Sequence, residues 1–277
     1  MRSLDPEPDR VMDYDVVEPI NLDRMIGTTR RDARRSRKKT SVAARLMRAA
    51  STAASPTIER FNTSICSPEG LAAALDFDII FSCVDRPWPR AVLNTLAYAD
   101  LIPVIDGGIN IETRPGPDGG MRGASWRAHT LVPGRTCLQC SRQLAAHEAT
   151  LDMGGLLDDP EYIRRAGRPT GGSPNVALLS ASVSAAQLAQ LVSLVAKPAG
   201  FGVPLPLRYS LAGHLHEHLN CEPAEYCPVE KSVAVGDQRQ SLIRDEGPWI
   251  QGQREPTLLA RARSAVGQRV GRLRPRG

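Results

Sequence analysis

The sequence predicts an α/β protein with a doubly wound, mostly parallel sheet of the Rossmann type. Between residue 10 and about residue 106, short apolar runs alternate with longer segments of helical periodicity, which is the pattern of βαβ units. Asp13 and Asp85 lie near the ends of two apolar runs, where ligands bind in open sheets of this kind. With 277 residues and 42% hydrophobic side chains, the chain is large enough to bury a substantial core.

Each element follows from its local pattern. Between Asp78 and Asp85 the side chains are apolar except for Ser82, which indicates a buried strand over residues 77–85. Ser67 and Pro68 open the preceding helix, because serine caps the first amide groups of a helix and proline fits its first turn. We expect strands at residues 10–15, 57–65, 77–85 and 101–108, and helices at residues 31–52, 67–76 and 89–100.

The second half of the chain is less regular. Residues 109–136 read as extended segments separated by a turn-rich insertion, and residues 148–173 are irregular and rich in glycine and proline. Residues 175–197 predict an amphipathic helix that packs on the sheet. We therefore expect one nucleotide-binding domain over residues 1–234 and a basic, loosely ordered tail over residues 235–277.

Composition narrows the class of protein. The net charge of +5 is concentrated in residues 30–48, which carry nine Arg and Lys against one Asp, and in residues 254–277, which carry seven Arg against one Glu. Aromatic residues make up only 4% of the chain, so stacking platforms for single-stranded nucleic acid are scarce. The start has no apolar signal segment, and serine and glutamine interrupt the longest apolar run. We expect a cytoplasmic protein that binds neither nucleic acid nor membrane.

Several polar residues suit a nucleotide. Asp13 or Asp15, at the end of the first predicted strand, can accept hydrogen bonds from ribose hydroxyls. Arg24 can contact phosphate through its planar guanidinium group, and Lys39 adds a second cation. Asp85 can hold Mg²⁺ against a triphosphate.

The order of these residues resembles the ThiF/MoeB/HesA family of adenylyltransferases, which are related to the ubiquitin-activating enzymes. The resemblance covers residues 10 to about 230. The positions that match the family pattern are Asp13, Asn21, Leu22, Arg24, Asp32, Lys39, Asp85, Arg90 and Asn94.

The resemblance implies that the protein uses ATP and Mg²⁺ to activate the C-terminal carboxylate of a ubiquitin-like or sulfur-carrier protein as an acyl-adenylate. It implies that Asp13 binds the ribose, that Asn21, Arg24 and Lys39 bind or orient the phosphates, and that Asp85 holds the metal ion. It also implies a homodimer. Arg86 stands where the family often carries asparagine, which is a departure next to the metal position.

The six cysteines predict a zinc site in addition to free thiols. Cys137 and Cys140 have the CxxC spacing of zinc ligands, and lie where the family places half of a structural zinc site. Cys221 and Cys227 are the thiols available to complete the site, and a histidine could replace one of them; the candidates are His214, His216 and His218. Cys66 and Cys83 lack features of a catalytic nucleophile, so we expect activation without a covalent protein intermediate.

The glycine-rich turn that approaches phosphates in this class is expected before the strand that carries Asp13. Only twelve residues precede Asp13, and none is glycine. We therefore expect a family member that is truncated at its N-terminus, with unpaired strand edges beside a gap in the sheet and no activity without the additional segment.

Three other functions remain open at this point. A non-catalytic relative could keep the partner surface and the zinc site as a scaffold. A nicotinamide-dependent oxidoreductase is compatible with the fold class alone, although hydride transfer requires neither Arg24, Lys39 nor the CxxC. A zinc-dependent nucleic-acid binder is suggested by the sequence pI of about 9.0 and is disfavoured by the low aromatic content.

Overall fold

The computed structural model describes residues 8–114, 120–167, 176–200 and 202–253. Two sheets form the centre of the protein. In the first, β1 (Asp9–Met12) pairs in parallel with β2 (Ile58–Phe61). In the second, the strands follow the order β3-β4-β5-β6-β7; their bounds are Ile80–Ser82, Val104–Thr113, Met121–Leu131, Leu207–Ser210 and Leu215–His218.

The predicted α/β class with parallel units is confirmed, but the prediction of a mostly parallel sheet is wrong. Among the described strands, β1 with β2 and β3 with β4 pair in parallel, whereas the pairs β4–β5, β5–β6 and β6–β7 are antiparallel. Residues 109–136, expected as separate extended segments, continue β4 and return as β5 over ten paired positions. This long hairpin makes the second sheet a mixed one.

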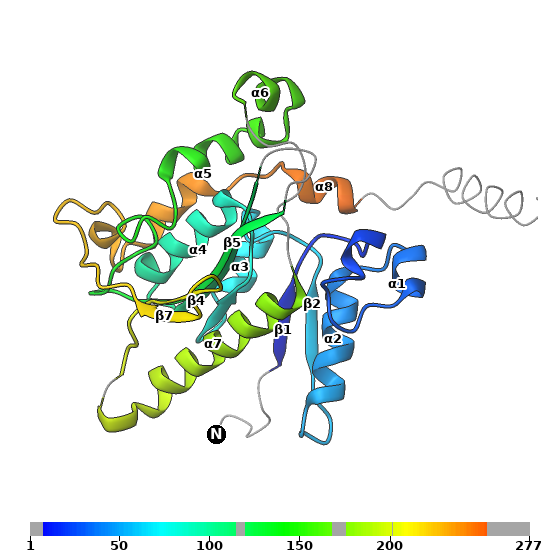
Figure 1. The fold of residues 1–277 in the computed structure, drawn as a ribbon, viewed down its shortest axis with the longest axis horizontal. Coiled ribbons are helices and arrows are strands. Elements are labelled where there is room, and N and C mark those ends of the chain that lie inside the picture. Colours follow the sequence, from blue (N-terminus) through cyan, green and yellow to red (C-terminus); the bar gives the residue numbers. More distant parts are fainter. Residues whose placement is uncertain (1–7, 115–119, 168–175, 201, 254–277) are drawn as a thin grey trace, which may run out of the picture.

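Helices cover both faces of the second sheet. The helix α7 (Ala177–Ala196) crosses one face and contacts β4 and β5 (Figure 1). The helix α4 (Pro87–Ala99) lies on the other face, and its Arg90 reaches Asp106 of β4. Ten of its thirteen residues are buried, because apolar side chains of the helix fill the main core. The remaining helices are α1 (Arg30–Arg34), α2 (Lys39–Ala50), α3 (Pro68–Ala74), α5 (Ala146–Met153), α6 (Pro160–Arg165) and α8 (Pro248–Gln253), with short 3-10 turns at Pro19–Asn21, Leu156–Asp158, Pro198–Gly200, Glu230–Ser232 and Gly236–Leu242.

The single helix predicted over residues 31–52 is divided into α1 and α2. Asp32 is buried and forms a capping box with Thr29, whose backbone N–H donates to the Asp32 carboxylate at 3.0 Å. Arg37 and Arg45 form ion pairs with the same carboxylate. Ser36 turns the chain between the two helices with a φ of 44°, in the left-handed region. The buried carboxylate therefore fixes an interruption that the periodicity of the sequence hides.

Polar side chains fasten α7 to the sheet. The Gln187 amide donates to the backbone carbonyls of Ser82 and Ile105, and the Gln190 amide donates to that of Ala128. Gly107 leaves the space that the Gln187 side chain occupies, because a Cβ at this position would lie 2.5 Å from it.

By length and composition α7 could cross a membrane. Its buried glutamines match a helix packed on a sheet, whereas its opposite face exposes apolar side chains, namely Leu178, Leu188, Val192 and Val195.

The prediction of a loosely ordered segment from residue 235 is wrong for residues 236–253. The Trp249 ring is buried and lies 5.4 Å from the Trp88 ring of α4, measured between ring centroids. The Trp88 indole N–H donates to the carbonyl of Leu242 at 2.6 Å, and Arg239 pairs with Asp100. This segment therefore covers α4 as part of the domain. The basic residues 254–277 lie outside the described residues.

Replacing Trp249 with alanine is expected to lower the free energy of unfolding by about 3–5 kcal/mol, because a large buried side chain leaves a cavity against Trp88. Urea unfolding of the full chain measures the loss. Val235→Ala removes a side chain that is 45% exposed and serves as the control. A Trp249→Ala variant as stable as this control would contradict the packing of the segment.

Candidate functional site

The carboxyl end of β1 brings two aspartates to the first turn of α2. The backbone N–H of Asp13 donates to the carbonyl of Phe61 at 3.1 Å, which extends the pairing of β1 and β2 by one residue. Lys39 is the first residue of α2; its backbone N–H donates to the carbonyl of Asp15 at 3.1 Å, and its Nζ lies 2.6 Å from Asp15 Oδ2. Main-chain and side-chain contacts thus fix Lys39 beside the strand end.

Asp85 reaches the same group from the second sheet. It follows the end of β3 by three residues, directly before α4, and its side chain is exposed. Its carboxylate acts electrostatically on both Asp13 and Lys39, which requires proximity because such interactions weaken with distance. The structure therefore brings together Asp13, Lys39 and Asp85, three of the residues predicted for the nucleotide, with Asp15 as a fourth member.

Burial and charge oppose each other in this group. Burial raises the pKa of Asp13 above its usual range, and the nearby Lys39 ammonium only partly offsets the effect. Burial lowers the pKa of Lys39, but Asp13, Asp15 and Asp85 together outweigh it, so the pKa of Lys39 is raised. Lys39 is therefore fully charged at neutral pH. The group holds one cation among three carboxylates.

The other two residues predicted for the nucleotide have different surroundings. Asn21 is buried, and its Oδ1 accepts from the backbone N–H of Glu18 at 2.9 Å, which caps the turn at Pro19–Asn21. Arg24 follows this turn and is half-buried; within the described part of the chain, no ion pair includes its guanidinium group. The observed contact of Asn21 is structural, and phosphate contacts of Asn21 and Arg24 stay predictions.

Further residues of the family pattern support the fold. Arg90 pairs with the buried carboxylate of Asp106, which also accepts from the Ser82 hydroxyl at 2.8 Å. Asn94 Oδ1 accepts from the backbone N–H of Leu138 at 2.9 Å and so positions the loop between Cys137 and Cys140. Asp106 itself was missed by the sequence analysis, although its position at the end of an apolar run was the available signal.

Arg86 is directed away from the aspartate group. Its guanidinium pairs with the buried carboxylate of Asp152 in α5 and, at 2.8 Å, with Asp158. The backbone N–H of Trp88 donates to the same Asp152 carboxylate at 2.9 Å. Arg86 therefore joins α4 to α5 and does not add a cation to the candidate nucleotide site.

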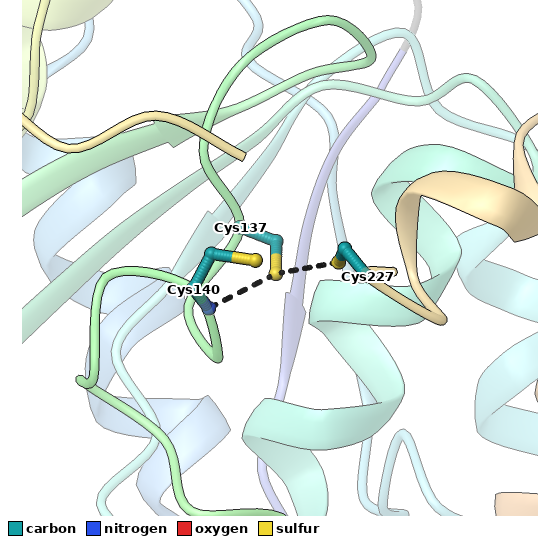
Figure 2. A group of neighbouring side chains, drawn as sticks. All are labelled: Cys137, Cys140 and Cys227. Carbon is teal, nitrogen blue, oxygen red and sulfur yellow. Dashed lines mark hydrogen bonds between the residues drawn. The ribbon is translucent and has the colours of Figure 1, made fainter. Parts of the chain in front are cut away.

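Three cysteine thiols form a compact group. The sulfur atoms of Cys137, Cys140 and Cys227 all lie within 4.8 Å of one another (Figure 2). The Sγ atoms of Cys137 and Cys227 are 3.6 Å apart, which is close to the separation of about 3.8 Å expected between two thiolates on one tetrahedral zinc ion. The backbone N–H of Glu230 donates to Cys227 Sγ, and that of Ala224 donates to Cys140 Sγ. Such N–H donors stabilise thiolates, so the group fits a zinc ion.

Cys221, the fourth cysteine predicted as a ligand, does not belong to this group. Its thiol donates to the carbonyl of Leu219 at 3.7 Å, whereas its own carbonyl accepts from the Thr136 hydroxyl next to Cys137. The backbone of Cys221 is thus adjacent to the CxxC segment, but its sulfur atom lies outside the group of three sulfur atoms. The candidate histidines are also elsewhere: the His216 ring packs on Tyr209 at 4.9 Å between centroids, and His214 Nδ1 lies 2.9 Å from the Tyr209 hydroxyl.

The comparison with protein families decides the family of the chain. The model of the ThiF family matches residues 10–215, which is most of the chain. The protein belongs to the ThiF family. The match confirms the resemblance carried by the residues from Asp13 to Asn94.

Solved structures of other proteins share the fold of this ThiF protein. E. coli MccB with ATP has 18% sequence identity and a TM-score of 0.56, and covers 79% of this chain and 58% of its own. The microcin C7 biosynthetic enzyme MccB in complex with N-formylated MccA has 19% identity and a TM-score of 0.55, with 80% and 59% covered. The chain thus spans about three fifths of the length of these structures. No curated protein matches the sequence.

The raised pKa of Asp13 predicts a pH-dependent stability. A carboxyl group whose pKa is higher in the folded state contributes stability at low pH and loses it as the pH rises through that pKa. Asp13→Asn is therefore expected to be more stable than the wild type at pH 7, and this difference is expected to shrink at pH 4. Urea unfolding at both pH values measures it.

Asp15→Asn provides the control for this pH experiment. The Asp15 carboxylate is 48% exposed and pairs with Lys39, so its removal is expected to leave stability at pH 7 unchanged or slightly lower. An Asp13→Asn variant that is less stable than the wild type at pH 7 and equal to it at pH 4 would contradict the electrostatic account.

Proposed function

We propose that this ThiF-family protein is an ATP-dependent adenylyltransferase that activates the C-terminal carboxylate of a ubiquitin-like, sulfur-carrier or other polypeptide substrate. The observation that carries the proposal is the convergence of Asp13, Lys39 and Asp85 from two sheets at the carboxyl ends of their strands. Family membership supports it, as does the shared fold with MccB, of which one structure contains ATP.

The chemistry makes use of both signs of charge. A carboxylate oxygen of the substrate attacks the α-phosphorus of ATP, a P–O bond forms, and the bond to pyrophosphate breaks. Both reactants are anionic, so a fixed cation must reduce their repulsion, and Lys39 is held in that position by its contacts with Asp15. Asp13 would accept hydrogen bonds from the ribose, and Asn21 and Arg24 would orient the phosphates. Asp85, which is exposed, would hold Mg²⁺.

The first test of this function measures pyrophosphate release from Mg-ATP by the full chain. A peptide that ends in Gly-Gly with a free carboxylate is the co-substrate, and the same peptide with a C-terminal amide is the matched control. Release is expected with the free acid only. Lys39→Ala is expected to slow release roughly 100-fold, whereas Lys231→Ala, which packs over Tyr226, leaves it unchanged.

Three outcomes would contradict the adenylyltransferase proposal. Equal pyrophosphate release with the acid and the amide would exclude activation of a carboxylate. If the protein releases no pyrophosphate but forms a stable complex with a carrier protein, the second candidate function, a scaffold without activity, is favoured. The structural observation that favours a scaffold is the open edges of β1 and β3 among the described strands. Saturable NADH binding would favour the oxidoreductase.

We also propose that Cys137, Cys140 and Cys227 bind a structural Zn²⁺ ion and that Cys221 supplies the fourth thiolate after its side chain rotates. The short distances among the three sulfur atoms support the site, and the contact between Thr136 and the Cys221 carbonyl keeps the fourth thiol within the same loop region. In such a site the ion would tie the CxxC loop to the segment that carries Cys227 and so stabilise the fold.

Zinc content measured by atomic emission tests this site. About one zinc ion per chain is expected for the wild type and for Cys83→Ser, the control, whose thiol contacts Gln187. Cys227→Ser is expected to lose most of the zinc, and Cys221→Ser to bind it more weakly in a competition with a chromogenic chelator. Wild-type protein without bound zinc after expression in zinc-supplemented medium would contradict the proposal.

The homodimer, the carrier-protein partner and the cytoplasmic location stay predictions. The exposed apolar face of α7, which includes Leu188, Val192 and Val195, is a surface that self-association would cover.

A further inference from the structure

Arg127 is a half-buried cation that has no ion-pair partner among the described residues. It lies on β5 opposite Gly108 of β4, and its guanidinium group packs directly over this glycine, because a Cβ at residue 108 would lie 2.7 Å from Nη2. The Nε atom is buried and has no hydrogen-bond acceptor. Within residues 8–114, 120–167, 176–200 and 202–253, no carboxylate forms an ion pair with Arg127.

The nearest carboxylate is already used. Both oxygens of Asp106 accept from Arg90, and Oδ1 also accepts from Ser82. Burial lowers the pKa of Arg127 to about 10, and the positive charge of Arg90 acts in the same direction, whereas the Asp106 carboxylate only partly offsets them. The group remains charged at neutral pH. A partly buried charge without an ion-pair partner is costly, so an anion at this position would be favourable.

The position of Arg127 relates it to the candidate nucleotide site. Ser82 of β3 is opposite Asp106 of β4. In the same parallel register Gly108 corresponds to residue 84, which precedes Asp85 in the sequence. Asp106 and Gly108 share one face of the sheet, and α4, which begins two residues after Asp85, supplies Arg90 to that face. The distance across the sheet from β3 to β5 is two strand spacings, or about 10 Å. An extended peptide covers this distance in about three residues.

We propose that Arg127 is a specificity-determining residue that binds an acidic side chain of the polypeptide substrate, about three residues before the carboxylate that is activated. The proposal rests on the proposed function for the place of the activated carboxylate. The planar guanidinium group can bind a carboxylate through two parallel hydrogen bonds, and the missing side chain of Gly108 provides the space in which this group lies. A guanidinium group also binds phosphate, so a phosphate of ATP is the alternative ligand that the tests must distinguish.

The test compares two pentapeptides in calorimetric titrations of the full chain without nucleotide. The first has four glycines and one aspartate, placed three residues before the C-terminal glycine; the second has asparagine at that position. The wild type is expected to bind the aspartate peptide about tenfold more tightly. Arg127→Gln is expected to abolish the preference, and Arg127→Lys to retain part of it. Equal affinities in the wild type, or no binding of either peptide, would overturn the proposal.

Thermal unfolding separates a binding role from a structural one. Arg127→Gln is expected to raise the melting temperature, because it removes a partly buried charge that has no ion-pair partner and whose Nε atom has no hydrogen-bond acceptor. Arg90→Gln is the matched control and is expected to lower it, because it leaves the buried Asp106 carboxylate unpaired. A melting temperature that falls as far in Arg127→Gln as in Arg90→Gln would overturn the proposal.

A titration with Mg-ATP distinguishes a substrate carboxylate from an ATP phosphate as the ligand of Arg127. It also separates this inference from the proposed adenylyltransferase function. Arg127→Gln is expected to bind Mg-ATP as the wild type does. Loss of Mg-ATP binding in this variant would mean that Arg127 contacts a phosphate and would overturn the inference. Wild-type protein that binds no Mg-ATP but prefers the aspartate peptide would contradict the proposed function and support the carboxylate site.

Discussion

The contact between Lys39 and the carboxyl end of β1 is the interaction on which the candidate site depends. Lys39 donates to Asp15 from both its backbone and its side chain, so the first turn of α2 cannot move without breaking two hydrogen bonds. The same ammonium group reduces the repulsion between Asp13 and Asp85, which arrive from different sheets. Lys39 therefore contacts the end of β1 and is under the electrostatic influence of Asp85 from the second sheet, at the edge where ligands bind in α/β proteins.

A second network connects this edge to the cysteine group. Arg90 and Asn94 lie one turn apart on α4, and so project from the same face of the helix. Arg90 neutralises the buried Asp106, and Asn94 holds the backbone of the CxxC loop. The helix thus fixes the position of the CxxC loop relative to the sheet. Both residues belong to the pattern by which the sequence resembles the ThiF family, and in the structure both act as supports.

The sequence predicted the features that depend on local pattern. The apolar runs predicted the strands β1 to β4, and the order of polar residues predicted Asp13, Lys39 and Asp85 as site residues. Features that depend on distant partners were not visible: the break before α2 arises because Asp32 pairs with Arg37 and Arg45, and the polar segment after residue 235 is ordered because Trp249 packs on Trp88. The direction of β5 follows from its antiparallel register with β4, whereas the sequence between the two strands suggested only a turn-rich insertion. Arg127 looked like any residue of an alternating strand, since only its register opposite Gly108 makes it distinctive.

The most direct test of the account is hydrogen exchange of the full chain with and without Mg-ATP, read by mass spectrometry. If the carboxylates and Lys39 form the nucleotide site, amide exchange slows in the segments that contain residues 13–15, 39–42 and 83–86, and does not change in β6 and β7. Slower exchange at another part of the sheet, or no change at saturating Mg-ATP, would contradict the assignment of this edge as the nucleotide site.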